Sequence, residues 1–215
     1  MNLIIFGPPG SGKGTYANRL KSQLGVATIA MGDILRELAK EETGLAKEIN
    51  VFLRQGKLVS DKIAIDVLKN QLEKQAVEGV ILDGYPRTLV QAKALEDLVT
   101  IDAIIHLVVP DWIIIERLSS RRICSKCGEV YNIRFLKPRQ PETCDKCGGK
   151  LLQRADDTTE VIKERIEIYE KQTRPLLQYF RKRIPIVLAK CDRVDTPPEV
   201  VVASILKGLE ALDLA

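Results

Sequence analysis

The chain has 215 residues, 45% of them hydrophobic and 29% charged, with a formal net charge of +4 at pH 7. This composition is ordinary for a soluble globular protein and allows one sizeable core plus insertions. Apolar runs are too short to span a membrane, and the N-terminus lacks the basic segment and cleavage site of a signal peptide. We therefore expect a cytoplasmic protein without a membrane partner.

The basic charge is concentrated in one segment. Residues 121–154 contain nine Lys or Arg and three Asp or Glu, a formal charge of +6, so the rest of the chain carries about −2. Such a concentration indicates a local anion site and not a surface coated with charge for nucleic acid. We therefore expect no nucleic-acid partner.

The N-terminal segment combines a strand, a glycine-rich turn and a helix. Leu3–Phe6 is an apolar run typical of a buried strand, and Tyr16–Leu24 has the spacing of an amphipathic helix. The turn between them has the residues of a phosphate-binding loop: Gly10, Ser11, Gly12, Lys13, Gly14 and Thr15. Backbone N–H groups and the helix N-terminus attract an anion there, and Lys13 is expected to reach the outer phosphates.

The residue after Lys13 departs from the commonest form of this loop. A Ser or Thr ordinarily follows the lysine and ligates Mg²⁺ through its hydroxyl group. Here Gly14 takes that position and Thr15 comes one residue later. We expect the loop to bind phosphate while Mg²⁺ is held mainly by the nucleotide and water, which argues against a motor ATPase or a GTPase.

Strand and helix patterns alternate along the rest of the chain. Further strands are predicted at Val26–Ala30, Val80–Asp83, Ala103–Val109 and Ile184–Leu188. Helices are predicted at Asp61–Leu72, Pro110–Ser120, Thr158–Arg183 with an interruption at Pro175, and Pro197–Leu212. The alternation predicts an α/β fold, a three-layer αβα core with a five-stranded parallel sheet.

Two segments interrupt this alternation. Residues 30–59 have a helical pattern without a strand, whereas residues 121–157 have little helical pattern and contain four of the five cysteines. Both are expected to be insertions set on a core of residues 1–29, 60–120 and 158–215.

The four cysteines form two CxxC pairs separated by sixteen residues: Cys124, Cys127, Cys144 and Cys147. This spacing is typical of a structural zinc site in which four thiolates surround one ion. Two disulfides are the first alternative, and a zinc ribbon that binds nucleic acid is the second.

Charged residues fall near the predicted edge of the sheet. Asp83 ends a strand, where it is suited to hold the water ligands of Mg²⁺ or, alternatively, to cap a turn. Six arginines are grouped near the same edge: Arg36, Arg87, Arg117, Arg121, Arg154 and Arg165. Planar guanidinium groups suit phosphoryl transfer between two nucleotides, where many negative charges meet. We interpret His106, Trp112 and Cys191 as packing residues.

Together these motifs resemble the adenylate kinases, in the form with a long lid and a four-cysteine zinc site. The resemblance covers essentially the whole chain. It rests on the Gly7–Thr15 loop, Gly32-Asp33 with Arg36, Gly56–Val59, Asp83–Arg87 with Gln91, Arg117 with Arg121, both cysteine pairs, and Arg154–Asp157 with Arg165. It implies reversible phosphoryl transfer from MgATP to AMP, giving two ADP, with Zn²⁺ as a structural ion. A monomer is expected.

The resemblance also implies roles for individual residues. Residues 30–59 would form the AMP-binding domain, and residues 121–157 a lid that closes over ATP. ATP would be bound by the Gly10–Thr15 loop, with Arg117 and Arg121 and with Val130 and Tyr131 over the nucleotide. AMP would be bound by Met31, Arg36, Lys57, Leu58, Val59, Gly84, Tyr85, Pro86, Arg87, Gln91, Arg154 and Arg165. The transferred phosphoryl group would be neutralised by Lys13, Arg87, Arg121, Arg154 and Arg165.

Two positions depart from the family pattern. Met31 stands where a Thr is common near the AMP base, and Asp192–Thr196 matches poorly where the family contacts the ATP adenine. One alternative is therefore a kinase for another monophosphate, such as UMP or CMP. The other is a zinc-ribbon nucleic-acid-binding protein with a regulatory ATPase core, which would bind RNA or DNA in a salt-dependent manner.

Overall fold

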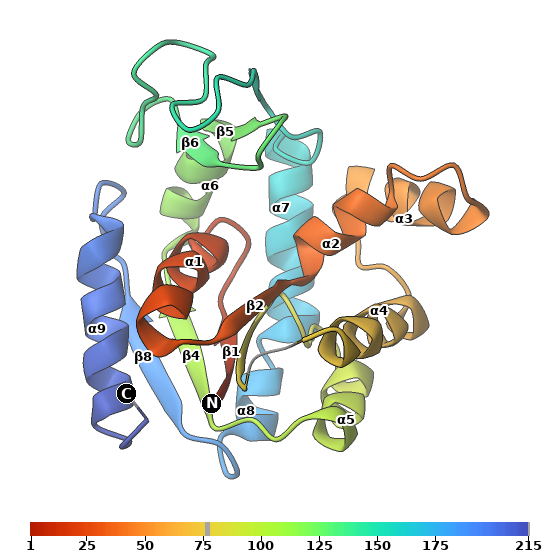
Figure 1. Ribbon diagram of the computed structural model, residues 1–215, viewed down its shortest axis with the longest axis vertical. Helices are drawn as coiled ribbons and strands as arrows, with labels where there is room; N and C mark the ends of the chain where they lie inside the picture. Colours follow the sequence, from red (N-terminus) through yellow and green to blue (C-terminus); the bar gives the residue numbers. More distant parts are fainter. Residues whose placement is uncertain (76–77, 215) are drawn as a thin grey trace.

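The computed structural model describes residues 1–75 and 78–214, and its centre is a parallel sheet with strand order β2-β3-β1-β4-β8 (Figure 1). The predicted five-stranded α/β core is thus confirmed. The strands are β1 Asn2–Phe6, β2 Ala27–Ala30, β3 Val80–Asp83, β4 Ala103–Val108 and β8 Ile186–Lys190. All neighbouring pairs in this sheet are parallel, so the carboxyl ends of the strands lie at one edge.

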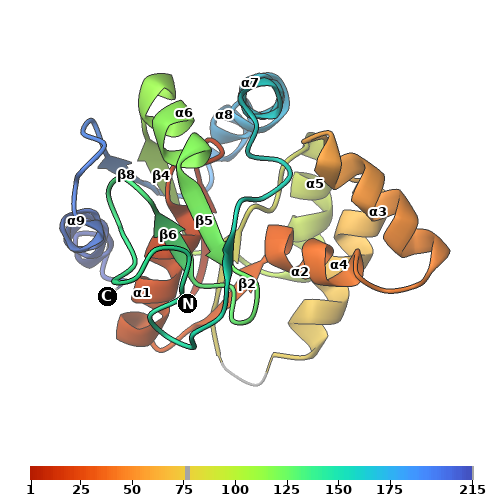
Figure 2. The same cartoon turned by 90° about the horizontal axis from the view of Figure 1, so that it is seen from above.

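Side chains alternate between the two faces of the sheet and build two cores. Leu3 and Ile5 of β1 pack in one cluster with residues of α1 Lys13–Leu24, α6 Asp111–Ser119, α7 Thr159–Ile168 and α9 Pro198–Glu210. Ile4 and Phe6 pack in the other cluster with residues of α4 Asp61–Glu73, α5 Leu89–Leu98 and α8 Leu176–Phe180. In Figure 2, α1 and α9 lie on the opposite side of the sheet from α4 and α5.

The two insertions have different structures. Residues 30–59 contain α2 Met31–Leu38 and α3 Gly44–Arg54, which project to one side of the sheet in Figure 1. Residues 121–157 contain a small antiparallel sheet of β6 Val130–Asn132, β5 Arg121–Cys124 and β7 Leu151–Leu152. The small core of this second segment consists of Cys124, Tyr131, Cys144 and Leu151, with Cys147 packed against it.

Several predicted boundaries shift for local reasons. β8 begins at Ile186 and not at Ile184, because the Ile184 N–H donates to the Phe180 carbonyl and Pro185 has no N–H to donate. The interruption expected at Pro175 starts earlier, as a π-helical turn at Tyr169–Thr173 between α7 and α8. α5 was not predicted, although Thr88 caps it by accepting a hydrogen bond from the Gln91 N–H.

Two of the expected packing residues differ from the prediction. Trp112 is 58% exposed, because the buried face of α6 is formed by Ile113, Ile114 and Leu118. His106 is half-buried in β4, and burial lowers its pKa.

Within the two described ranges, no helix is both long and apolar enough to cross a lipid bilayer.

Candidate active site

A cavity of about 940 Å³ lies at the carboxyl edge of the sheet, between the two insertions. Lys and Arg outnumber Asp and Glu in its lining by ten to four, so it favours a polyanion. Predicted site residues in this lining are Gly10, Gly12, Lys13, Gly14, Thr15, Arg36, Leu58, Asp83, Gly84, Tyr85, Pro86, Arg87, Arg117, Arg121, Val130, Tyr131, Arg154 and Arg165.

A smaller cavity of about 90 Å³ shares part of its wall with the large one. Arg36, Leu58, Arg87 and Arg165 line both. The small cavity adds the other residues predicted for the acceptor side: Met31, Lys57, Val59 and Gln91. The predicted acceptor residues therefore line two cavities that share part of a wall.

The glycine-rich loop forms one wall of the large cavity. Gly12 has a φ of 97° at the start of α1, and a Cβ there would come 2.8 Å from the Tyr16 ring, so this position requires glycine. The Lys13 ammonium donates to the Gly7 and Pro8 carbonyls, each at 2.8 Å. Ser11 differs from its neighbours, because it is fully buried and contributes to neither lining.

Asp83 faces this loop from the end of β3. A Cβ on Gly14 would lie 3.2 Å from Asp83 Oδ2, so glycine keeps the space over this carboxylate open. Burial raises the pKa of Asp83, and the nearby Lys13 charge opposes that shift. Mg²⁺ prefers oxygen ligands and retains several waters, so this single carboxylate fits a Mg²⁺ bound by phosphates whose waters reach Asp83.

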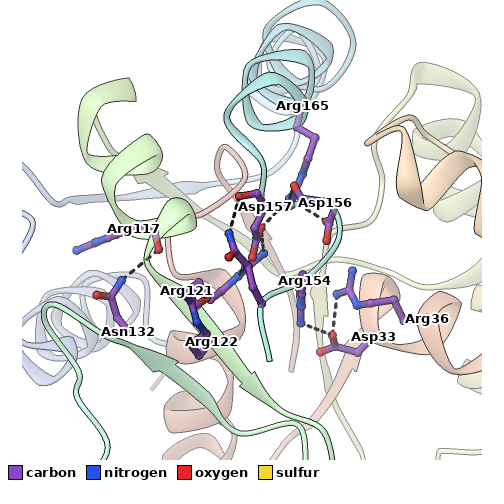
Figure 3. Close-up of polar contacts among 11 residues, drawn as sticks. Asp33, Arg36, Arg117, Arg121, Arg122, Asn132, Arg154, Asp156, Asp157 and Arg165 are labelled. Atoms are coloured by element: carbon purple, nitrogen blue, oxygen red, sulfur yellow. Dashed lines mark hydrogen bonds and ion pairs between the residues drawn. The ribbon is translucent and has the colours of Figure 1, made fainter. Parts of the chain in front are cut away.

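Aspartates hold the arginines of the cavity in place (Figure 3). Asp157 accepts from Arg121 Nη2 at 2.6 Å and from Nε at 2.8 Å, and its side chain is fully buried. Arg165 Nη1 lies 2.9 Å from Asp156 Oδ2 and 3.4 Å from Asp157 Oδ1. These bonds fix the guanidinium groups before an anion arrives, which lowers the entropy lost on binding.

A third aspartate, Asp33, links the two insertions. Asp33 Oδ1 accepts from Arg36 at 2.7 Å and from Arg154 at 3.1 Å, although Arg154 is 121 residues away in the sequence. Burial raises the pKa of Asp33, but the charges of Arg36 and Arg154 outweigh that effect and leave the pKa below its usual value. Asp33 is therefore an anion at neutral pH.

Burial and repulsion by neighbouring cations lower the pKa values of Lys13, Arg87 and Arg154. Burial lowers the pKa of Lys13 to about 8, with Asp83 opposing the shift. Burial and the Arg165 charge lower the pKa of Arg87 to about 10, and burial and the Arg121 charge lower that of Arg154 to about 9. A bound polyanion would relieve this repulsion, so the cavity is prepared for phosphate groups.

The small cavity contains an ordered amide. Gln91 is 2% exposed, its Oε1 accepts from the Arg87 N–H at 2.8 Å, and its Nε2 donates to Asp61 Oδ1 at 2.8 Å. An amide has two N–H groups and two lone pairs, so Gln91 retains one donor and one acceptor for a ligand. Met31, 2% exposed, adds an apolar surface beside it.

The opposite end of the large cavity surrounds Arg117. Its Nη2 lies 3.1 Å from Cys191 Sγ and 3.4 Å from the Val194 carbonyl. Val194, Asp195 and Thr196 line the cavity, so this segment reaches the site, although no contact with ATP could be predicted for it. Cys191 was expected only to pack, but it also orients an arginine.

Tyr131 has a second set of contacts besides its place in the cavity lining. Its hydroxyl oxygen accepts from the Asp145 N–H at 2.8 Å and lies 3.5 Å from Cys144 Sγ. The tyrosine is 6% exposed, so most of it packs within the cysteine segment. Val130, its neighbour, is half-buried in the same wall.

The four paired cysteines meet in a single cluster. Their sulfur atoms lie within 4.8 Å of one another, with 3.5 Å between Cys124 and Cys147 and 3.6 Å between Cys127 and Cys144. These distances exceed the S–S bond length of about 2.05 Å, and all five cysteines, which lie in the described part of the chain, are free thiols. A tetrahedral zinc ion about 2.3 Å from each sulfur separates the sulfurs by about 3.8 Å, so the cluster fits zinc.

The parallel sheet, the phosphate-binding loop at its carboxyl edge and the arginine-lined cavity define a P-loop phosphotransferase. The family model described as adenylate kinase matches residues 5–184. A protein named adenylate kinase from Treponema denticola is 45% identical over 188 residues, which cover 87% of this chain and 90% of that protein. A protein of the same name from Methanosarcina acetivorans is 42% identical over 214 residues, 96% of this chain and 99% of that protein.

A third relative, also named adenylate kinase, comes from Archaeoglobus fulgidus and is 43% identical over 189 residues, 85% of this chain and 87% of that protein. The chain belongs to the adenylate kinase family, and it is therefore a nucleoside monophosphate kinase.

Proposed function

We propose that the chain catalyses reversible phosphoryl transfer from MgATP to AMP, giving two molecules of ADP. The observation that carries this proposal is the position of Arg87 and Arg165, which line both the large and the small cavity. A phosphoryl group that passes between nucleotides bound in the two cavities would remain among these guanidinium groups. Family membership supports the same reaction.

The large cavity is the proposed donor site. Backbone N–H groups of the Gly10–Thr15 loop and the Lys13 ammonium would bind the ATP phosphates, and Arg117 would pack on the base. Mg²⁺, when bound, would neutralise the donor phosphates, with Asp83 holding its waters. The small cavity is the proposed acceptor site, where the free donor and acceptor of Gln91 match the complementary groups on the edge of adenine.

Catalysis would rest on position and charge. Lys13, Arg87, Arg121, Arg154 and Arg165 would stabilise the negative charge of the phosphoryl group as it moves. An acceptor phosphate oxygen is already ionised, so the chain needs no strong general base.

The insertions have distinct proposed roles. Residues 30–59 would act as the AMP-binding domain, and residues 121–157, held together by zinc, would act as a lid that closes over ATP. The excess of basic residues in 121–154 would draw the lid toward bound polyphosphate and exclude water from the transfer. A monomeric state, a cytoplasmic location, a role in nucleotide biosynthesis and the lack of a nucleic-acid partner stay predictions.

Acceptor specificity gives the first test. ADP formation from ATP is measured with AMP, UMP and CMP at equal concentrations. We expect AMP to give the highest kcat/KM, by more than about tenfold, because the Gln91 amide that matches the edge of adenine mispairs with the edges of uracil and cytosine. If UMP or CMP exceeds AMP, the assignment of the small cavity to adenine is wrong. If no monophosphate accelerates ATP consumption, the kinase proposal is wrong.

ATP binding should weaken as pH rises through the pKa of Lys13, which lies near 8 in the unliganded protein. The ammonium form binds phosphate, so ATP affinity should fall about fourfold between pH 7 and 8.5, as the protonated fraction falls. Titration calorimetry measures this change. The Lys13→Met variant should lack this fall in affinity, and any change that remains in it comes from the titration of ATP itself. An equal fall in both proteins would contradict the role of Lys13.

A further inference from the structure

Asn132 lies at the end of β6, where the lid meets the last turn of α6 (Figure 3). Its Nδ2 donates to the Arg117 carbonyl at 3.1 Å and to Ser120 Oγ at 2.9 Å. Its Oδ1 accepts from the N–H groups of Arg134 at 2.9 Å and Phe135 at 3.1 Å. All the hydrogen-bonding positions of this amide are thus occupied by two parts of the chain, the end of α6 and the turn after β6.

The contact with Arg117 completes the end of a helix. The last carbonyls of an α-helix lack partners within the helix, and α6 ends at Ser119. Asn132 supplies a donor to one of these carbonyls from the lid. Arg134 and Glu116 form an ion pair at the same junction. The start of the lid is therefore attached to the turn that carries Arg117.

Arg117 is held from the other side as well. Its guanidinium group contacts Cys191 and Val194 in the segment after β8, while its carbonyl is bound by Asn132. Phe135, whose N–H is also bound by Asn132, lines the same cavity. Asn132 thus fixes the part of the cavity wall at Phe135 relative to Arg117, on which the ATP base is proposed to pack.

We propose that Asn132 is a positioning residue for the donor base: it couples the lid to Arg117, so that the adenine of ATP is held between Arg117 and the loop at Phe135. This inference rests on the proposed function, because the role of Arg117 belongs to that proposal. If Asn132 positions the base, its substitution should weaken the binding of ATP, which carries a nucleoside, and leave the binding of inorganic triphosphate unchanged.

The test compares Asn132→Asp with Gln140→Glu. Asn132→Asp replaces both N–H donors with carboxylate oxygen and repels the Arg117 carbonyl. Gln140→Glu makes the same amide-to-carboxylate change at an exposed position of the lid. We expect Asn132→Asp to raise the KM for ATP about tenfold and to leave the KM for AMP and the inhibition constant of inorganic triphosphate within about twofold. Gln140→Glu should leave all three unchanged.

Zinc content and thermal unfolding identify a variant that has lost its fold, and Asn132→Ala then provides the same comparison without an added charge. If Asn132→Asp and Asn132→Ala weaken the binding of ATP and of inorganic triphosphate equally, the inference is wrong. It is also wrong if both variants, like Gln140→Glu, leave the binding of ATP unchanged. Transfer from ATP to AMP by the unmodified protein is measured alongside. If this transfer is absent, the proposed function is overturned. If the transfer is present but substitutions of Asn132 have no effect on ATP binding, only this inference is overturned.

Discussion

Arg121→Ala should lower kcat by about 10²- to 10³-fold while the protein remains folded. In the structure, Arg121 is presented to the large cavity by a bidentate contact with Asp157. Its proposed task is to neutralise charge on the phosphoryl group during transfer, and that charge is greatest in the transition state. The loss should therefore appear mainly in kcat and less in the KM values.

The fold should survive because Arg165 still lies 3.4 Å from Asp157 when Arg121 is removed. We expect a loss of about 1–2 kcal/mol in the free energy of unfolding. Arg122→Ala is the matched control, since Arg122 is the neighbouring arginine, lies outside both cavity linings and donates to the Arg121 carbonyl. It should change kcat less than about threefold. Near-normal turnover in Arg121→Ala would contradict the proposed role.

Cys144→Ser should release the zinc ion and unfold the lid without unfolding the core. Cys144 is 2% exposed, and it belongs to the small cluster that forms the apolar interior of residues 121–157, the proposed lid. Structural zinc contributes about 10–16 kcal/mol to the folding of small zinc domains, far more than so small a core supplies. Because Arg121 and Arg154 lie in this segment, kcat/KM should fall by more than about tenfold.

Metal analysis measures the zinc content, and hydrogen exchange measures protection in residues 121–157. Cys191→Ser is the control for metal content, because Cys191 is the buried cysteine outside the cluster. It should retain one equivalent of zinc. A Cys144→Ser protein with one equivalent and a protected lid would show that the four cysteines are not the ligand set.

Local features of this fold could be predicted because their signals lie close together in the sequence. The strand, the glycine-rich turn and the helix around Lys13 occupy consecutive residues, and each CxxC pair forms one turn. The five core strands could be recognised from their apolar runs. α5 was missed, although Thr88 followed by Gln91 is a helix-start signal that could have identified it.

Contacts between distant segments were not predictable in this way. Some of the aspartates that hold the arginines come from distant parts of the chain, as with Asp33 and Arg154, which are separated by 121 residues. These carboxylates lie within the recognisable motifs Gly32-Asp33 and Arg154–Asp157, but no spacing rule assigns them to partners. Asn132 carries no motif at all, and its role depends on β6 lying beside the end of α6. The exposure of Trp112 similarly depends on which face of α6 meets the core.

The most direct test follows the transferred phosphoryl group. The protein is incubated with ATP labelled in its γ-phosphate, with and without AMP, and the label is traced in the products. With AMP we expect the label in the β-phosphate of ADP. Without AMP we expect little release of inorganic phosphate, because the proposed closure of residues 121–157 over ATP would exclude water. Label that appears mainly as inorganic phosphate, whether or not AMP is present, would contradict direct transfer between two nucleotides.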